Sequence, residues 1–373
     1  MENKNEWRKV KLGDIGEIIT GKTPSTKKSD DLGNDYLFLT PKDMTGEKNK
    51  YKTERNVSIK IAQKNNQLIL KKNSICISCI GSDMGKVCIV KKISLTNQQI
   101  NSITNVKEDF NYEFIYYKLS MMKEYFKTIA GGTTIPILNK NDFSKIKILI
   151  PEIGIQKKIT KILSDIDSKI ELNNKINDNL EKQCVTIFKK MFSSIFYGSS
   201  NVGNYLKPKR GKNLLSKNAI LGDIPVVAGG LEPAIYHNKS NTQSPVITIS
   251  ASGANAGFIR LWHIPVWSSD SSYIDYSVSK YIYFWYVFLK LRQNEIYDLQ
   301  SGSAQPHIYP KHLEELSIDE LDIKLVKNFN EITSSFFEKI GKNNIENKKL
   351  SNLKNYLLPK LMNGEIDVEN IEL

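Results

Sequence analysis

Two long segments of the chain carry apolar residues at the spacing of an α-helix. After Pro151, apolar side chains recur every three or four positions from Ile155 to Met191, and residues 155–197 contain neither proline nor glycine. This periodicity predicts one continuous helix, on the order of 60 Å long at about 1.5 Å per residue. The glycine-containing segment 198–203 is expected to end it.

The second apolar stripe runs from Ile332 to Leu361, and Pro359 and Gly364 mark its end. Both stripes are narrow, so each helix needs a partner for its apolar seam. We expect the two helices to pair with each other as an antiparallel coiled coil; packing of each helix on its own domain is the alternative. The predicted seam consists of Ile155, Ile159, Ile162, Ile166, Leu180, Ile187, Ile340, Leu350, Leu353 and Leu357.

The remainder of the chain mixes strand-like and helical patterns. Residues 74–80 and 244–250 are rich in β-branched side chains and each precedes a glycine-containing turn, which favours strands. Residues 112–128 and 280–299 have the periodicity of amphipathic helices. These patterns predict globular parts that are mixed but strand-rich.

The two halves of the chain resemble each other. Residues 131–148 align with residues 301–318 at an offset of 170, and residues 81–85 align with 253–257 at an offset of 172. Solenoid repeats are about 20–50 residues long. The much longer period found here indicates a duplicated unit of one domain plus its linker.

The predicted fold is therefore α+β: two similar mixed, strand-rich domains, separated by two long helices that form an antiparallel coiled coil, with a pseudo-twofold internal repeat. The expected parts are a first globular domain at 1–150, a central long helix at 151–198, a second globular domain at 199–320 and a C-terminal long helix at 321–373.

Composition adds a polyanionic partner to this picture. The chain has 53 Lys and Arg against 40 Asp and Glu, a net charge of +13 and a pI near 9.2. Such a surplus favours nucleic acid, although a lysine-rich composition without functional meaning is the alternative. Four cysteines in 373 residues are too few for a disulfide framework. The N-terminus does not resemble a signal peptide and the longest apolar stretch, residues 281–289, is too short to cross a bilayer, so we expect a cytoplasmic protein without a membrane partner.

Patterns typical of catalysis lack their context. Residues 16–23 (GEIITGKT) match the phosphate-binding loop, but no apolar helix follows, so we regard an NTPase as improbable on this segment. Cys76 and Cys79 have metal-ligand spacing without a second pair, and buried structural thiols are expected instead. The histidines and carboxylates suggest neither a metal site nor a catalytic triad, and we find no cofactor-binding turn.

Polar and basic loops in both halves provide recognition chemistry. Lysine and arginine suit contacts to phosphate, while amides, arginine and histidine suit base edges. Each such residue taken alone is more often a solvated surface group. The candidate DNA-binding residues are Lys22, Ser25, Lys27, Lys28, Lys42, Lys86, Gln98, Gln99, Asn101, Thr133, Lys207, Lys209, Arg210, Lys212, Asn238, Lys239, Asn255, Arg260, Gln305 and His307.

Several blocks along essentially the whole chain resemble the specificity subunits of type I restriction-modification systems. The most specific block is the ending LLPKLMNGEI at residues 357–366. Residues 153–156 (IGIQ) depart from the family's usual Leu-x-Glu-Gln. The other matching blocks are Trp7, 10–15, 80–86, 97–101, 252–258, 267–270 and 300–307.

The resemblance implies two target-recognition domains, each recognising one half of a bipartite site in double-stranded DNA, with the coiled coil fixing the gap and docking methyltransferase subunits. It implies a complex with two modification subunits, which bind S-adenosylmethionine and methylate adenine, and two restriction subunits, which translocate and cut DNA with ATP and Mg²⁺. This chain is then a DNA-recognition subunit without a catalytic centre, cofactor or metal of its own. Two alternatives remain. One is a subunit of a related methyltransferase or type IIB-like system without separate restriction subunits, and the other is a coiled-coil scaffold without DNA contacts.

Overall fold

The computed structural model describes residues 7–24, 32–130, 136–233, 235–302, 306–369 and 371. The chain divides into two compact units, unit 1 (Met1–Ser168 and Ser351–Leu373) and unit 2 (Lys169–Leu350), each with its own hydrophobic core. The predicted DNA-binding residues Ser25, Lys27, Lys28, Thr133 and Gln305 lie outside the described ranges.

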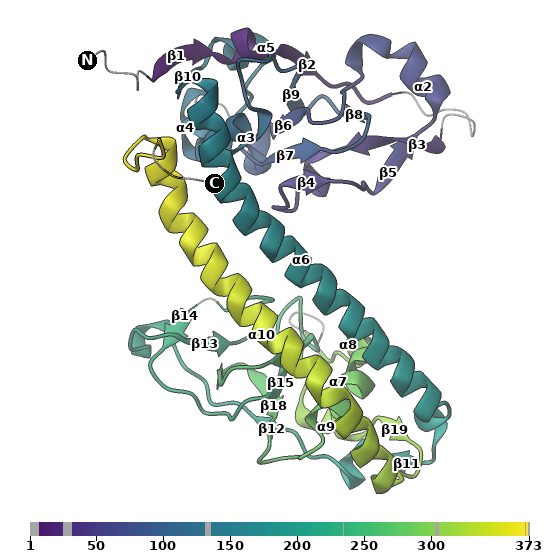
Figure 1. The fold of residues 1–373 in the computed structure, drawn as a ribbon. Helices are drawn as coiled ribbons and strands as arrows, with labels where there is room; N and C mark the ends of the chain where they lie inside the picture. Colours follow the sequence, from purple (N-terminus) through teal and green to yellow (C-terminus); the bar gives the residue numbers. More distant parts are fainter. Residues whose placement is uncertain are drawn as a thin grey trace. The chain divides into compact units, whose positions relative to one another are not determined.

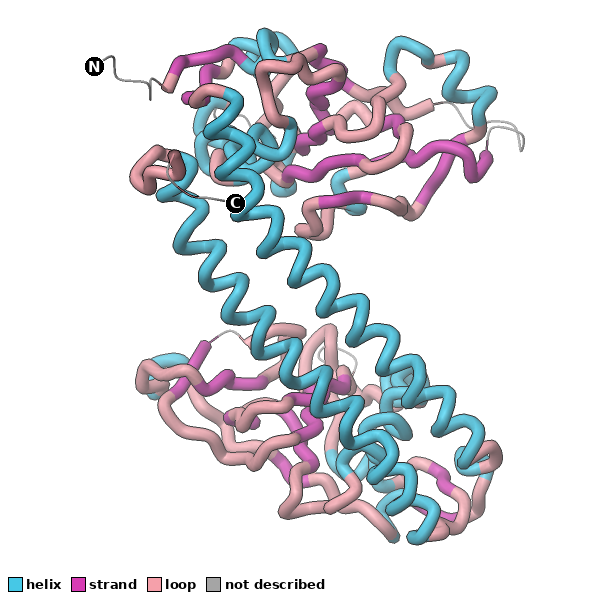
Figure 2. The backbone as a smooth tube through the Cα atoms, in the orientation of Figure 1, coloured by secondary structure: helices cyan, strands magenta, loops and turns pink. Residues whose placement is uncertain are grey.

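Unit 1 contains three sheets of short strands joined by long loops (Figures 1 and 2). Their strand orders are β2-β9-β6-β7-β4, β5-β3-β8 and β1-β10. The strands are β1 Arg8–Lys11, β2 Glu17–Thr20, β3 Leu32–Leu39, β4 Asn49–Lys50, β5 Arg55–Val57, β6 Ile75–Ser78, β7 Val87–Val90, β8 Ser94–Thr96, β9 Ile100–Thr104 and β10 Lys147–Ile150. The helices are α1 Leu12–Ile15, η2 Pro41–Asp43, α2 Ile59–Lys64, η3 Asn66–Leu68, η4 Gly81–Asp83, α3 Tyr112–Ser120, α4 Lys123–Ile129 and α5 Lys140–Lys145.

The centre of the largest sheet explains the apolar run at residues 74–80. Strand β6 has the sequence ICIS and is buried throughout, because β9 and β7 flank it and α3 packs against it. Helix α3 begins where the Asn111 side chain accepts hydrogen bonds from the backbone amides of Glu113 and Phe114. The strand predicted from β-branched residues is confirmed.

Unit 2 repeats these elements. Its sheets have the orders β12-β18-β15-β16, β14-β13-β17 and β11-β19. The strands are β11 Ser200–Asn201, β12 Lys209–Arg210, β13 Ile224–Val227, β14 Ile235–His237, β15 Val246–Ser250, β16 Ile259–Trp262, β17 Trp267–Ser268, β18 Ser271–Ile274 and β19 Ser317–Ile318. The helices are η5 Ile195–Tyr197, η6 Val202–Asn204, η7 Ser216–Asn218, α7 Ile282–Leu291, α8 Gln293–Asp298 and α9 Pro310–Glu314.

The two units share one topology. Strands β2-β9-β6-β7 correspond to β12-β18-β15-β16, and β5-β3-β8 corresponds to β14-β13-β17, with a parallel pair at β3–β8 and again at β13–β17. The glycine turns match as well: the Gly85 amide donates to the Ser78 carbonyl at 2.8 Å, and Gly257 donates to Ser250 at 2.8 Å. Both glycines have positive φ, which favours glycine over any other residue. The predicted duplication is confirmed.

The two predicted long helices are α6, Ile153–Met191, and α10, Ile323–Met362. Helix α6 ends six residues before the expected residue 197, because Phe192 and Ile195 turn into the core of unit 2. Pro359 lies inside the last turns of α10 and does not end it.

In each unit, hydrogen bonds join the parts of α6 and α10 that belong to it. In unit 2, Asn173 donates to Asn347 and Asn343 donates to Asn177, at 2.9 and 2.8 Å. In unit 1, Lys354 donates to Asp167 at 2.6 Å. Residue numbers rise along one helix as they fall along the other, so the antiparallel pairing is confirmed.

The seam itself differs from the prediction. Ile155 and Ile159 are buried in the core of unit 1, so packing on the unit's own domain also occurs. Ile166 is buried as well. Ile162, Leu180, Ile187, Ile340, Leu350 and Leu357 are partly buried. Leu353 is 46% exposed, so its assignment to the seam is wrong.

Two smaller corrections concern the amphipathic helices. Residues 112–128 form α3 and α4 with a break after Ser120, and residues 280–299 form α7 and α8 with a break at Arg292. Each break lets the following short helix bury an apolar side chain, Phe126 in unit 1 and Ile296 in unit 2. Among the described residues, no helix combines the length and apolarity needed to cross a bilayer.

Candidate nucleic-acid interface

One exposed lysine occupies the same place in both units. Lys22 follows Gly21 after β2, and Lys212 follows Gly211 after β12. The Lys22 and Lys212 amides each donate at 2.9 Å to the carbonyl of the last residue of a neighbouring strand, Thr96 of β8 and Ser268 of β17. A Cβ on Gly21 or Gly211 would lie 2.3 or 2.5 Å from a backbone oxygen, so the chain needs glycine at both places. The exposed ammonium groups are suited to phosphate contacts.

Beside Lys212, unit 2 carries a network of polar side chains. Arg210 Nη2 lies 2.7 Å from Asp270 Oδ1, and the Ser252 hydroxyl donates to the other oxygen of Asp270. The Arg210 guanidinium lies 5.8 Å from the centre of the Tyr309 ring, on which His307 stacks. Arg210 and Asp270 keep 40% and 34% of their side-chain surface exposed. The network thus holds a cation and a carboxylate in fixed positions at the surface.

In unit 1 the corresponding loop carries amides. Gln98 is exposed and accepts a hydrogen bond from the Thr23 hydroxyl at 2.7 Å. Gln99 is partly buried, and its Oε1 accepts from Asn97 Nδ2 at 3.0 Å. Both amides keep donors and acceptors that suit the edges of bases.

Several other predicted residues are also at the surface. Lys209 donates to the Ser277 hydroxyl at 2.9 Å. His307, which is partly buried, pairs through its backbone with Ser301. The remaining exposed members of the predicted set are Lys42, Lys207, Asn238 and Lys239.

Asn101 needs a correction. Its side chain is 2% exposed, accepts from the Thr20 hydroxyl at 2.6 Å and donates to the Leu138 carbonyl at 2.9 Å. A buried amide that is satisfied in this way ties β2 and the segment before α5 to β9, and it does not reach a ligand.

Three more candidates are tied to neighbouring groups. Lys86 pairs with Asp83 at 2.7 Å, and Asn255 donates to a backbone carbonyl at 3.4 Å. Arg260 lies over the Trp262 ring at 4.1 Å and pairs with Glu232 at 3.0 Å. We therefore place these three at the margin of the interface.

The phosphate-loop match is excluded by structure. Residues Glu17–Thr20 within it form strand β2, paired with β9, and Ile18 and Ile19 are buried. A strand in a sheet cannot curl around a phosphate with its amides. The NTPase interpretation of residues 16–23 is therefore rejected.

The cysteines are buried, as expected of structural thiols. Cys76, Cys79, Cys88 and Cys184 are free and buried. Burial raises the pKa of Cys79 and of Cys184 to about 12, so both stay protonated at neutral pH. Among the described residues, no cluster of His, Cys, Asp and Glu could hold a metal ion.

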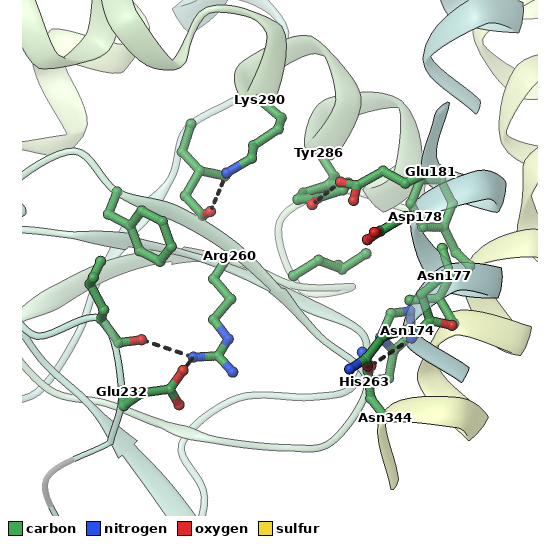
Figure 3. Close-up of a pocket in the computed structure, with 16 residues that line it drawn as sticks. Asn174, Asn177, Asp178, Glu181, Glu232, Arg260, His263, Tyr286, Lys290 and Asn344 are labelled. Carbon is green, nitrogen blue, oxygen red and sulfur yellow. Dashed lines mark hydrogen bonds and ion pairs between the residues drawn. The ribbon is translucent and has the colours of Figure 1, made fainter. Parts of the chain in front are cut away.

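Unit 2 also contains a pocket of about 490 Å³ between β16, α7 and the helix pair, lined by both polar and apolar side chains (Figure 3). Glu181 of α6 accepts a hydrogen bond from Tyr286 at 2.6 Å, and Lys290 donates to the Ile259 carbonyl at 3.4 Å. Burial lowers the pKa of His263 to about 4, so the imidazole is neutral. His263 fits because α10 has Gly341 there, where a Cβ would lie 2.5 Å from the ring.

Sequence reasoning missed Asp270, Tyr309 and the pocket. Asp270 lies inside the family block 267–270 and Tyr309 inside the repeat block 301–318, so these two blocks were the signal that could have found them. The pocket residues come from α6, α7, β16 and α10, and no local pattern joins segments so far apart.

The chain contains two copies of one strand-rich unit. Each copy has an exposed lysine at the same position, next to loops with hydrogen-bonding side chains. This arrangement is typical of a protein that binds its ligand through two similar domains. A sequence profile for the type I restriction modification DNA specificity domain matches residues 4–182. The type I restriction enzyme MjaIX specificity subunit of Methanocaldococcus jannaschii is 27% identical, covering 98% of this chain and 95% of the relative. Residues 4–182 therefore match the DNA specificity domain of type I restriction-modification systems, and nearly the whole chain is similar to a type I specificity subunit.

Two further comparisons agree. The HindI specificity subunit of Haemophilus influenzae is 36% identical over 179 residues, which are 46% of this chain and 39% of that protein. The crystal structure of a type I restriction-modification S subunit from M. genitalium superposes with a TM-score of 0.65 at 20% identity, covering 97% of both chains, and supports the α+β fold with long helices.

Proposed function

We propose that each unit recognises one half of a bipartite DNA site and that the chain itself performs no catalytic step. The single observation that carries this proposal is the equivalent lysine, Lys22 in unit 1 and Lys212 in unit 2, held beside loops of hydrogen-bonding side chains. Equivalent phosphate contacts would position both units on the DNA duplex in the same way. The residues around each lysine would then determine which base sequence that unit binds. The recognition domains in this proposal are residues 1–150 and 199–320.

The two half-sites are proposed to differ in sequence. The loop next to Lys22 carries the amides of Gln98 and Gln99. Next to Lys212, Arg210 at the end of β12 pairs with Asp270, which lies between β17 and β18. Amides and ions favour different base edges. A protein with identical surfaces in both units would instead favour a symmetric site.

The linking helices, at 151–198 and 321–373 in this proposal, set the length of the unread gap. Helices α6 and α10 have 39 and 40 residues, on the order of 60 Å at about 1.5 Å per residue. One turn of DNA is about 34 Å, so a span of this length suits half-sites a helical turn or more apart. The antiparallel hydrogen bonds found in each unit support a paired helical linker.

The same helices are proposed to dock modification subunits. Apolar side chains stay exposed on both of them: Leu172 on α6 is 52% exposed, and Leu353 and Tyr356 on α10 are 46% and 60% exposed. Exposed apolar side chains on a helix favour a protein partner. In the proposed complex, two modification subunits use S-adenosylmethionine to methylate adenine, and two restriction subunits use ATP with Mg²⁺.

The test is to express the chain with the modification subunit of its own system and to map methylated sites across a genome. A bipartite motif is expected. Deletion of residues 172–178 together with 342–348, which face each other in the helix pair, removes about 10 Å of helix, or about three base pairs of gap.

Both half-sites should remain readable after the deletion. A matched control replaces residues 199–320 with another recognition domain, which should change one half-site and leave the gap unchanged. An unchanged gap in the deletion variant contradicts the role of the helices, and absence of any motif, the outcome expected of a scaffold, contradicts the proposal as a whole.

A further inference from the structure

We infer that one set of four equivalent positions recognises a G·C pair in the half-site of unit 2 and an A·T pair in the half-site of unit 1. The inference rests on the proposed function and deepens it by naming specificity-determining residues. The four positions in unit 2 and their equivalents in unit 1 are Arg210 and Thr20, Asp270 and Gln99, Ser252 and Ile80, and His307 and Ile137.

Backbone hydrogen bonds establish the first two equivalences. The Ala251 amide donates to the Asp270 carbonyl at 3.1 Å, as Cys79 donates to the Gln99 carbonyl at 2.8 Å. Arg210 is the last residue of β12, paired with β18, and Thr20 is the last residue of β2, paired with the equivalent β9. In both units the next residue is the tightly packed glycine described above.

Isolated bridges establish the other two equivalences. Ser252 pairs with His307 in unit 2, and Ile80 pairs with Ile137 in unit 1, each between a glycine turn and the loop after a matched proline. The turn amides bond alike, because Gly253 and Gly81 each donate at 3.1 Å to a proline carbonyl. Thus the four positions lie on the same backbone frame in both copies.

In unit 2 this frame carries ions. Asp270 occupies one edge of the Arg210 guanidinium, at 2.7 Å, and the Ser252 hydroxyl fixes Asp270 in turn. Among the described residues, the remaining guanidinium donors have no hydrogen-bond partner, so they can form the two parallel hydrogen bonds that arginine makes with guanine O6 and N7. The Asp270 carboxylate next to it suits the N4 amino group of the paired cytosine.

In unit 1 the same frame carries a neutral set, two polar and two apolar side chains. The Ile137 side chain is 53% exposed, and Ile80, its bridge partner, is partly exposed. An apolar side chain there suits the thymine methyl group. Gln99, fixed through Asn97 at 3.0 Å, offers an amide that pairs with adenine N6 and N7.

Structural stability does not account for these residues. An ion pair with 40% and 34% of its side chains exposed contributes little to folding, and an isoleucine that is 53% exposed buries only about half of its surface. Contact with DNA bases would explain why both the charged set in unit 2 and the neutral set in unit 1 stand at the surface.

The experiment maps methylated motifs for the full chain with its modification subunit, comparing Arg210→Gln, Asp270→Asn and Ile137→Ser with wild type. Arg210→Gln and Asp270→Asn are expected to lower the preference for G·C at one position of one half-site by roughly 5- to 150-fold. Ile137→Ser is expected to lower the preference for A·T at one position of the other half-site. Lys280→Gln, which removes an exposed cation outside the cluster, is the matched control and should keep the wild-type motif.

The outcomes separate the inference from the function on which it rests. A wild-type bipartite motif that is unchanged in all three variants overturns the inference and leaves the proposed function standing. The same holds if Arg210→Gln and Ile137→Ser alter the same half-site. If the wild-type chain yields no bipartite motif, the proposed function fails and the inference with it.

Discussion

Replacing Tyr117 with phenylalanine is expected to loosen α3 from the helices of unit 1. The Tyr117 side chain is fully buried, and its hydroxyl donates to Asp167 Oδ2 at 2.6 Å and accepts from Lys48 Nζ at 3.0 Å. Lys354 holds the other oxygen of Asp167 at 2.6 Å, and Lys48 pairs with Glu113 at 2.9 Å. Burial and the neighbouring charge of Asp167 raise the pKa of Tyr117, so the phenol stays protonated and acts as a donor.

The expected loss follows from what the variant leaves behind. A hydrogen bond to a charged group contributes about 1.5–3 kcal/mol. In Tyr117→Phe, Asp167 keeps Lys354 and Lys48 keeps Glu113, so neither charge is left without a partner. We therefore expect a loss of about 2 kcal/mol, in the middle of that range. Asp167→Asn should cost more, about 3 kcal/mol, because it leaves the largely buried Lys354 ammonium without its carboxylate.

Hydrogen–deuterium exchange of the amides of α3 measures this loss locally. A change of about 2 kcal/mol corresponds to roughly 30-fold faster exchange. Tyr116→Phe is the matched control, since this neighbour on α3 lies outside the hydrogen bonds of the network, and exchange in α7 of unit 2 is the internal reference. If Tyr117→Phe accelerates exchange of α3 no more than Tyr116→Phe does, the network does not hold α3 and the reasoning is refuted.

Two further predictions concern unit 2. His263 has a pKa of about 4 in the folded chain against 6.5 in the unfolded chain, so only the unfolded chain takes up a proton as pH falls below about 6.5. Protonation of this group should therefore lower the free energy of unfolding by about 2 kcal/mol between pH 7 and pH 5. Urea unfolding of His263→Gln should show a smaller decrease over the same pH range. An equal decrease in the variant and the wild type would contradict the lowered pKa of His263. Phe188 is fully buried and packs on Phe284 and Phe329, with ring centres 5.5 and 5.4 Å away, so Phe188→Ala should cost about 3–5 kcal/mol in urea unfolding. Leu172→Ala, at a 52% exposed position, should cost less than about 0.5 kcal/mol, and comparable losses would contradict the packing argument.

The parts of the fold that repeat a local pattern could be predicted from the sequence. Helical periodicity located α6 and α10, and the offset of 170 residues indicated the duplication that the matched sheets confirm. Exact partners could not be predicted, because periodicity does not say against what a stripe packs. Ile159 fits the stripe and is buried in the core of unit 1, while Leu353 fits it equally and is exposed.

The candidate interface was predictable in outline only. Lysines in loops such as Lys22 and Lys212 are exposed because their charge opposes burial, and composition alone carries that expectation. Polar side chains carry no such guarantee: Asn101 has the chemistry to contact a base, yet its hydrogen bonds to Thr20 and Leu138 place it in the interior. Which amides are satisfied internally depends on contacts between distant segments, and these exist only in the folded chain.

The amides at the centre of the helix pair have a consequence for alignment. Asn173 and Asn343 are each 1% exposed, and they bond across to Asn347 and Asn177. If one helix slid along the other by a heptad, these amides would face side chains that do not match them, and each buried amide left unpaired costs about 1–3 kcal/mol. An all-leucine contact would tolerate such a shift. The asparagines instead restrict the helices to a single register, and they do so at some cost in the stability of the helix pair.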